Sequence, residues 1–249
     1  MRVVTPSRLL GEAAEVLAPV WKDVVVVGAA ALDVALAEAA VAITPTRDVD
    51  VVVPVASASE VVRHLEASDM RPSETPHERG FTWIRGDLKM QLVRTFHPFP
   101  EPAARPLPAN PVFDIATRSE CQSVVAFAGA PRAARLLCAN AGCLLALKQA
   151  AFGRRRATDD TPVDRDFHDA YLLIASVPDR VVDDMMVGGY EVRTRASDAI
   201  DQLAGGGHAT QAAGRQIVRL RAADTQREAE AAVRRAAARI QRRIADASP

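Results

Sequence analysis

Two aspartates, Asp48 and Asp50, lie two positions apart at the start of the valine-rich run TPTRDVDVVVP. A run of valines is typical of a buried strand, and side chains two apart on a strand point to the same face, with Cα atoms about 6.5–7 Å apart. Two carboxylates placed in this way can bind one divalent cation, and Mg²⁺ is commonly held by protein carboxylates together with substrate phosphates. The pair therefore predicts a magnesium site. The alternative is two strand-end residues that face water.

A glycine turn precedes the two aspartates. The segment DVVVVGAAALDVALAEA predicts a buried strand, a turn at Gly28 and a helix from about Ala30 to Ala40. The N-terminus of a helix presents free N–H groups and the positive end of its dipole, and phosphates bind there. The order of strand, glycine turn, helix and D-x-D strand favours nucleotide binding. A tight turn without a ligand is the alternative for Gly28.

The second half of the chain contains a lysine among leucines and alanines, Lys148 in LLALKQAAF. An ammonium on an apolar helix needs a partner, and a triphosphate is a suitable one, although the side chain can instead extend to water. Asp166 and Asp169 lie three apart on one face of the next predicted helix, RDFHDAYLL. Either could pair with Lys148 or Arg165, or contact a nucleotide base. The alternative for both aspartates is a first-turn position favoured by the helix dipole.

The remaining pattern predicts an α/β (α+β) chain. Helices are expected over residues 7–18 and 57–68, a hairpin over 79–96 with Gly86-Asp87 at its turn, and a strand over 123–129. From Ala130 on, the strand pattern stops, and PRAARLLCANAGCLLALKQAAF predicts one helix of about five turns. We therefore expect a mixed sheet with flanking helices over residues 1–129 and a helical domain over residues 130–249, which carries Lys148 and the Asp166/Asp169 helix.

Composition narrows the class of protein. The chain has 249 residues, 49% of them hydrophobic, and a formal net charge of +0, so no global field selects nucleic acid or membrane as a partner. Its three cysteines, Cys121, Cys138 and Cys143, are an odd number in a long chain, which favours reduced thiols over a disulfide framework. The N-terminus lacks a signal-peptide pattern, and the most apolar window, residues 24–43, is interrupted by two acids and a glycine. We expect a cytoplasmic protein with no membrane partner.

The motifs resemble those of the nucleotidyltransferase-like proteins of the AbiEii/MenT toxin group, within the DNA polymerase β-type nucleotidyltransferase superfamily. Members of that group carry a strand, Gly-Gly-Ser/Thr, a helix, and a threonine or serine two residues before an Asp-x-Asp strand. A second signature is a lysine in an apolar helix, followed by a helix with a basic residue and Asp-x-x-Asp. The matching residues over positions 24 to 174 are Gly28, Thr46, Asp48, Asp50, Lys148, Arg165, Asp166 and Asp169.

The resemblance implies transfer of a nucleoside monophosphate from an NTP to an acceptor hydroxyl, with Mg²⁺ held by Asp48 and Asp50. The 3′ end of tRNA is the implied acceptor, and a cognate antitoxin protein is an implied partner. Catalytic roles are implied for Asp48, Asp50, Lys148 and Asp166. The implied nucleotide-binding residues are Gly28, Ala29, Thr46, Arg47, Lys148 and Asp169.

The chain departs from the family pattern at two places. The second glycine and the hydroxyl residue of the phosphate loop are Ala29 and Ala30, so a side-chain donor is lost. A third carboxylate is expected within DLKMQLV, but that position is Gln91, and Asp87 is too close to the hairpin turn. These departures leave open a non-catalytic binding protein of the same fold. A small-molecule, aminoglycoside-like nucleotidyltransferase is a further alternative, which would need an acidic pocket for its cationic acceptor.

Arginines supply candidate contacts to a nucleic-acid acceptor. Arg154, Arg155 and Arg156 follow the Lys148 helix, and the tail from Arg215 to Arg243 has nine arginines against four acids up to Asp246. Arginine binds phosphate bidentately, and such contacts supply most non-specific affinity for nucleic acids. Together with the tRNA acceptor that the resemblance implies, these residues lead us to predict RNA binding by Arg154, Arg155 and Arg156. The alternative is a solvated helix face.

Overall fold

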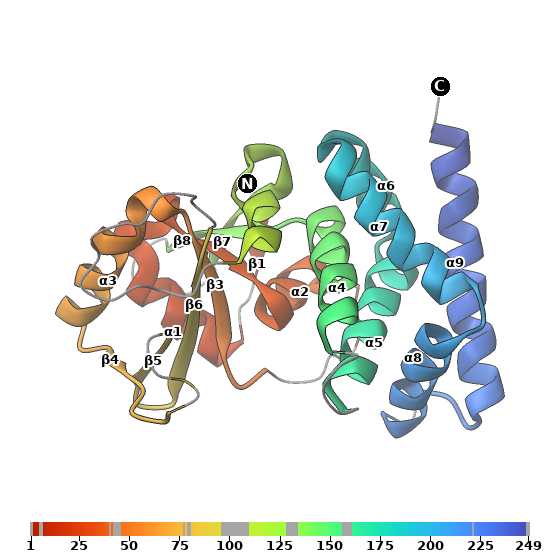
Figure 1. Ribbon diagram of the computed structural model, residues 1–249, viewed down its shortest axis with the longest axis horizontal. Coiled ribbons are helices and arrows are strands. Elements are labelled where there is room, and N and C mark those ends of the chain that lie inside the picture. Colours follow the sequence, from red (N-terminus) through yellow and green to blue (C-terminus); the bar gives the residue numbers. More distant parts are fainter. Residues whose placement is uncertain are drawn as a thin grey trace. The chain divides into compact units, whose positions relative to one another are not determined.

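The computed structural model describes residues 2–4, 7–39, 41, 46–76, 78, 81–95, 110–127, 134–155, 161–220 and 222–247, with the backbone alone for 2–4, 153–155 and 161–163. The chain forms two compact units, Met1–Asn140 and Ala141–Pro249, which we name the sheet unit and the helical unit. In Figure 1 the sheet unit runs from red to green and the helical unit from green to blue.

The sheet unit is built on a mixed sheet whose described strands lie in the order β1-β7-β8-β2-β3-β6-β5-β4. The pairs β1–β7, β2–β8 and β3–β6 are parallel, and the other neighbours are antiparallel. The strands are β1 (Arg2–Val4), β2 (Val25–Val27), β3 (Val49–Val53), β4 (Arg71–Pro72), β5 (Thr82–Arg85), β6 (Leu88–Arg94), β7 (Gln122–Phe127) and β8 (Arg135–Ala139).

The two central strands of this sheet, β2 and β3, are rich in valine. Val49, Val51, Val52 and Val53 are each at most 1% exposed, so residues on both faces of β3 are buried. β-Branched residues suit such strands because their stiff side chains pack well on a pleated surface. Asp50 interrupts this run and is half-buried. The strand that contains Asp50 and directly follows Asp48 is therefore part of the buried core.

Three α-helices and four short 3₁₀-helices accompany the sheet among the described residues. As predicted, the first helix buries one apolar face, including Leu10, Ala13 and Leu17. The second helix directly follows β2 in the chain and packs against β2, β3 and β8 of the sheet. The helices are α1 (Arg8–Leu17), η1 (Ala18–Asp23), α2 (Gly28–Leu36), η2 (Val55–Ser57), α3 (Ala58–Ala67), η3 (Pro111–Thr117) and η4 (Ser119–Cys121).

The strand β8 corrects the expectation that strands end at Ala130. Residues Arg135–Ala139 pair parallel with β2 and antiparallel with β7, so the expected five-turn helix is instead a strand followed by a shorter helix from Ala141. A short apolar run such as LLCA suits a strand as well as a helix, and its pairing partners decide between them. The division between the units accordingly follows Asn140, not residue 129.

The helical unit confirms a helical second half. Within it, the helix that begins at Ala141 packs against the three helices that follow it in the chain. The helix that begins at His208 packs against the helix that begins at Thr161 and against the last helix. The tail forms two helices, which bury Ile217, Val233, Ala237 and Ile240, whereas Leu220 is exposed. The helices are α4 (Ala141–Arg155), α5 (Thr161–Ser176), α6 (Pro178–Val187), α7 (Gly189–Ala204), α8 (His208–Arg219) and α9 (Gln226–Ala247).

The start of α4 is held by α6. The Asp184 carboxylate accepts hydrogen bonds from the N–H groups of Ala141 (2.8 Å) and Gly142 (3.4 Å), two of the first-turn groups that have no partner within the helix. A Cβ on Gly142 would lie 2.8 Å from the backbone nitrogen of Met185, so glycine permits this close approach. The contact fixes the helix that carries Lys148.

The fold bears on the expected α/β class, on the cysteines and on membrane-spanning helices. The mixed α/β architecture with a helical second half is confirmed, and Cys121, Cys138 and Cys143 are buried. Burial raises the pKa of Cys138 to about 12. No helix in the described part of the chain combines the length and apolar character needed to cross a membrane.

Candidate functional site

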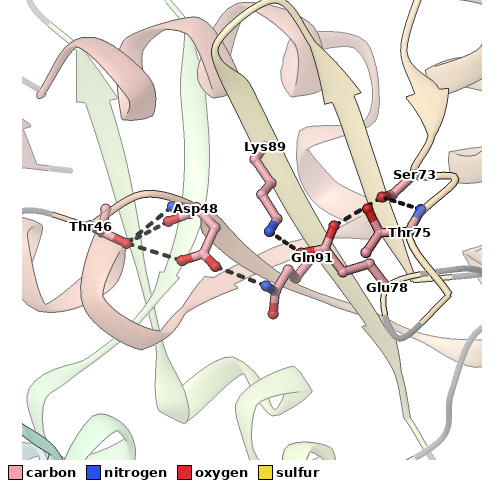
Figure 2. Close-up of polar contacts among 7 residues, drawn as sticks. All are labelled: Thr46, Asp48, Ser73, Thr75, Glu78, Lys89 and Gln91. Carbon is pink, nitrogen blue, oxygen red and sulfur yellow. Dashed lines mark hydrogen bonds and ion pairs between the residues drawn. The ribbon is translucent and has the colours of Figure 1, made fainter. Parts of the chain in front are cut away.

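Asp48, Asp50 and Gln91 lie on one face of the sheet. Asp50 pairs with Val27 of β2 and with Gln91 of β6, and residues in register extend their side chains to the same face. Asp48 comes two residues before Asp50, immediately before β3. The Gln91 amide Nε2 donates a hydrogen bond to Asp48 Oδ2 at 2.8 Å, which joins the two strands at this point (Figure 2). The predicted same-face arrangement of the two aspartates is thereby confirmed.

Thr46 holds Asp48 in a short turn. Its hydroxyl donates to the backbone oxygen of Asp48 at 2.7 Å and lies 3.2 Å from Asp48 Oδ1, while the Asp48 N–H donates back to Thr46 Oγ1 at 3.4 Å. A side-chain hydroxyl that bonds to the nearby backbone stabilises such a turn. Thr46 is therefore a positioning residue for Asp48. Arg47, between them, is exposed, and nucleotide contacts by Thr46 and Arg47 stay predictions.

Gly28 lies directly against Asp50. A Cβ built on Gly28 would stand 2.2 Å from Asp50 Oδ2, and the residue has φ +64°, a conformation that favours glycine. The helix α2 begins at Gly28 itself and ends at Leu36, so it starts earlier and is shorter than expected. Ala29 and Ala30 lie in its first turn. The free N–H groups of a helix start are thus beside a carboxylate of the D-x-D pair, as the predicted order of elements requires.

Gln91 occupies the position where a third carboxylate was expected. It lies opposite Asp50 in the β3–β6 register, and it donates a hydrogen bond where a carboxylate would accept or ligate. Asp87 is exposed in the hairpin turn and pairs with Arg8 at 3.0 Å. Across the residues that the structure describes, no group of three or more His, Cys, Asp and Glu side chains is arranged to hold a metal ion. The two aspartates alone still fit one Mg²⁺ ion, since this ion keeps several waters and binds substrate phosphates.

A second polar network continues along β6. Lys89, two residues before Gln91, pairs with Glu78, and the other oxygen of Glu78 accepts a hydrogen bond from Ser73 Oγ at 2.9 Å (Figure 2). The Thr75 N–H donates to the same Ser73 hydroxyl at 3.3 Å. Sequence analysis missed this network. The alternation of Lys89 with Gln91 in DLKMQLV was the available signal, since it places both on one face.

In the helical unit, Lys148 pairs with both predicted aspartates. Its Nζ lies 2.8 Å from Asp166 Oδ1 and 2.6 Å from Asp169 Oδ2, and Lys148 is only 9% exposed. The alternative in which the lysine extends to water is therefore wrong. Burial disfavours the ammonium, but the nearby charges of Asp169 and Asp166 outweigh burial, so that the pKa of Lys148 is raised. Contacts of Lys148 or Asp169 with a nucleotide stay predictions.

The alternative of first-turn carboxylates is also wrong for Asp166. The helix α5 begins at Thr161, so Asp166 lies in its second turn, and Asp164 is the acid of the first turn. Asp164 is 3% exposed and binds Arg215 of α8 through Nε at 3.0 Å and Nη2 at 2.7 Å. Arg219 lies 3.3 Å from the same carboxylate. Two of the tail arginines therefore stabilise the helical unit internally.

His168 is a buried residue beside the lysine that sequence analysis did not single out. It is 2% exposed, its ring packs against Tyr171, and Nδ1 has no hydrogen-bond partner within the described residues. Burial lowers the pKa of His168; Asp169 raises it, while Arg165 and Lys148 lower it further. Its position between Asp166 and Asp169 in the sequence was the signal that could have found it. The imidazole is thus held neutral next to a charged cluster.

The predicted RNA-binding arginines lie largely outside the described residues. The backbone of Arg154 and Arg155 belongs to the last turn of α4, but their side chains are not among the described parts of the structure. Arg156 lies entirely outside the described residues. On α9, Arg239 donates to the Ala175 backbone oxygen at 2.9 Å, and Arg243 pairs with Asp179. The exposed arginines of this helix are Arg227, Arg235, Arg239 and Arg242.

The predicted site residues thus form two clusters, one in each unit. Gly28, Thr46, Asp48 and Asp50 meet in the sheet unit, and Lys148 meets Asp166 and Asp169 in the helical unit. Comparison of the chain with protein-family models, with curated proteins and with solved structures gives no match.

Proposed function

We propose that this protein is a Mg²⁺-dependent nucleotidyltransferase that moves a nucleoside monophosphate from an NTP to an acceptor hydroxyl. The observation that carries the proposal is the packing of Asp50 against Gly28 at the start of α2, with Asp48 on the same sheet face. This arrangement supports the proposal because two carboxylates, which could ligate a cation, lie near the N–H groups of a helix start. A nucleoside triphosphate needs both, because its phosphates bind cations and N–H donors together.

Each residue of the sheet-unit cluster has a defined task in this reaction. Asp48 and Asp50 would hold Mg²⁺, which when bound neutralises phosphate charge. Thr46 fixes the direction of the Asp48 carboxylate, and the first turn of α2 orients the phosphates. The acceptor oxygen forms a bond to the α-phosphorus as the bond from that phosphorus to the β-bridging oxygen breaks. Pyrophosphate leaves with the bonding electrons, and the hydroxyl proton passes to water.

The acceptor in this proposal is the 3′ end of a tRNA, and the protein is the cytoplasmic toxin of a toxin–antitoxin pair, with an antitoxin protein as its partner. The resemblance of the D-x-D and Lys148 motifs to those of the AbiEii/MenT group supports this acceptor. Exposed arginines on α9 also support it, since Arg235 and Arg242 lie two turns apart on one side of that helix.

A non-catalytic nucleotide-binding protein is the second candidate. The observation that favours it is the hydrogen bond from Gln91 to Asp48, which uses a carboxylate oxygen that a cation would require. Under this candidate the protein binds an NTP at the same site but labels no acceptor. The two candidates therefore differ in one measurable result, the covalent product.

Incubation with labelled NTPs, Mg²⁺ and total tRNA tests the proposal. We expect label in tRNA, and we expect Asp48→Asn to lower the rate at least about 100-fold, as the loss of a transition-state charge stabiliser does. The matched control is Asp87→Asn, which removes an exposed acid of the same unit and should leave the rate unchanged. Transfer by Asp48→Asn at the wild-type rate would refute the assigned site. NTP binding without any labelled acceptor would select the non-catalytic candidate.

A further inference from the structure

Thr82, on β5, has a buried hydroxyl that finds no partner among the described residues. The residue is 0% exposed, and its Oγ1 forms no hydrogen bond within the part of the chain that the structure describes. Such a group is unusual, because a buried hydroxyl loses its hydrogen bonds to water and normally gains others in exchange. The Thr82 hydroxyl is therefore able to accept or donate a hydrogen bond when a neighbouring group moves.

The neighbour directly across the strands is Gln91. Thr82 and Gln91 are register partners in the antiparallel β5–β6 pair, so their side chains share a face. The adjacent Leu92 N–H donates to the Phe81 oxygen at 2.7 Å, which makes the pair of Thr82 and Gln91 a non-hydrogen-bonded one. Side chains approach most closely in pairs of this type. Since β6 lies between β3 and β5, Gln91 has Asp50 as its register partner on one side and Thr82 on the other, and its amide bonds to Asp48 on the β3 side.

Other groups on this face are already engaged. Lys89 pairs with Glu78, and Glu78 accepts a hydrogen bond from the Ser73 hydroxyl. These three side chains are therefore bonded to one another. The Asp48 carboxylate, in contrast, is held through Oδ2 by a neutral amide donor. A divalent cation at Asp48 and the partly positive N–H of Gln91 would repel each other at that oxygen.

We propose that Gln91 is a positioning residue that exchanges hydrogen-bond partners. Without a cation, its amide donates to Asp48 Oδ2. When Asp48 and Asp50 ligate a divalent cation, the amide turns away and donates to the Thr82 hydroxyl. This inference rests on the proposed cation site. It predicts that the amide lowers cation affinity, because only the fraction of molecules with a released Asp48 is competent to bind.

The test is a double-mutant cycle read out by Mn²⁺ affinity, with free Mn²⁺ measured by electron paramagnetic resonance on the full chain. We expect Gln91→Leu to bind Mn²⁺ more tightly than the wild type. We expect Thr82→Val, which removes the hydroxyl and keeps the branched shape, to weaken binding by roughly three- to tenfold, the factor of one neutral hydrogen bond. In the Gln91→Leu background the same Thr82→Val change should have no effect.

Matched controls separate this role from a structural one. Thr82→Ser keeps the hydroxyl and should keep wild-type affinity, and thermal unfolding establishes that each variant folds. If Thr82→Val does not fold, the side-chain amide signal of Gln91 in a ¹⁵N spectrum of the wild type decides, because it should shift on addition of Mg²⁺. An unchanged signal would overturn the inference.

The outcomes also distinguish this inference from the proposed function. Weaker binding by Gln91→Leu would mean that the amide supports the cation, and an equal effect of Thr82→Val in both backgrounds would mean that Thr82 acts independently. Either result overturns the partner exchange while metal-dependent transfer stands. Absence of Mn²⁺ binding by the wild type, even with NTP present, would overturn the inference and the metal-dependent reaction together.

Discussion

The carboxylate of Asp50 packs so closely against Gly28 that a β-carbon on that glycine would stand 2.2 Å from Asp50 Oδ2. Gly28 also has φ +64°, in the left-handed region. Two separate constraints, a close contact and a backbone conformation, therefore both require glycine at the start of α2. The contact connects the predicted phosphate-binding turn to the predicted cation ligand.

Gly28→Ala should lower the free energy of unfolding by about 1–2 kcal/mol through the left-handed backbone, and by more through the contact with Asp50. It should also weaken NTP binding, because Asp50 must move. The matched control is Gly86→Ala. Gly86 has φ +57° and nothing within 4 Å of its would-be Cβ, so this variant isolates the backbone cost. Urea unfolding and titration with a fluorescent NTP measure both effects. Equal behaviour of the two variants would contradict a role for the Asp50 contact.

Lys148→Met should destabilise the protein by about 3–5 kcal/mol, the cost of breaking a buried ion pair from one side. The side chains of Asp166 and Asp169 are 6% and 3% exposed, so both carboxylates would stay buried without the ammonium that pairs with them. Replacing both by asparagine in the Lys148→Met background should restore most of the stability. Chemical denaturation measures this, and a Lys148→Met variant as stable as the wild type would contradict it.

The stability-restored variant also tests the predicted catalytic role of Lys148. If the ammonium contacts the triphosphate, this variant should fold normally and yet transfer nucleotide more slowly, by orders of magnitude, than a variant in which Asp166 and Asp169 alone are replaced by asparagine. Lys148→Arg should recover little of the rate, because a planar fork replaces a compact point donor. Wild-type turnover in the folded variant would show that Lys148 has a structural role alone.

Stability should decrease on mild acidification because of His168. Its pKa is lowered in the folded state, so below the ordinary value of about 6.5 the unfolded chain binds a proton that the folded protein resists. The free energy of unfolding therefore falls as the pH decreases through this range. His168→Leu should reduce that fall between pH 7.5 and 5.5, measured by urea unfolding. An identical pH dependence in wild type and variant would contradict the assignment.

The exposed and the engaged arginines should differ in their effects. Arg235→Ala with Arg242→Ala should weaken tRNA binding and reduce the slope of log K against log salt by about 1.4–1.8, if each arginine contacts one phosphate. Stability should be unchanged, since both side chains are exposed. Arg215→Ala should instead lower stability, because Asp164 is buried and loses its bidentate partner. Filter binding from 50 to 200 mM salt gives the slope, and an unchanged slope would exclude this face.

The sequence alone was sufficient for the features that depend on contiguous residues. The order of β2, the Gly28 turn, α2 and β3 follows from valine runs and a single glycine, and the β5–β6 hairpin follows from alternation around Gly86. The same-face placement of Asp48 and Asp50 follows from the period of a strand. These are local consequences of backbone geometry, so these elements of the sheet unit could be predicted.

Tertiary structure decided what local pattern leaves open. β8 is a strand because β2 and β7 flank it, although its apolar run also suits a helix. Lys148 could have paired with water, phosphate or acid, and packing of α4 against α5 gave it two aspartates. Asp164 finds Arg215 fifty-one residues away, and Gln91 finds Asp48 across a strand pair. Hydrogen-bond and ion-pair partners depend on which distant segments a fold brings together, and no periodicity along the chain encodes that distance.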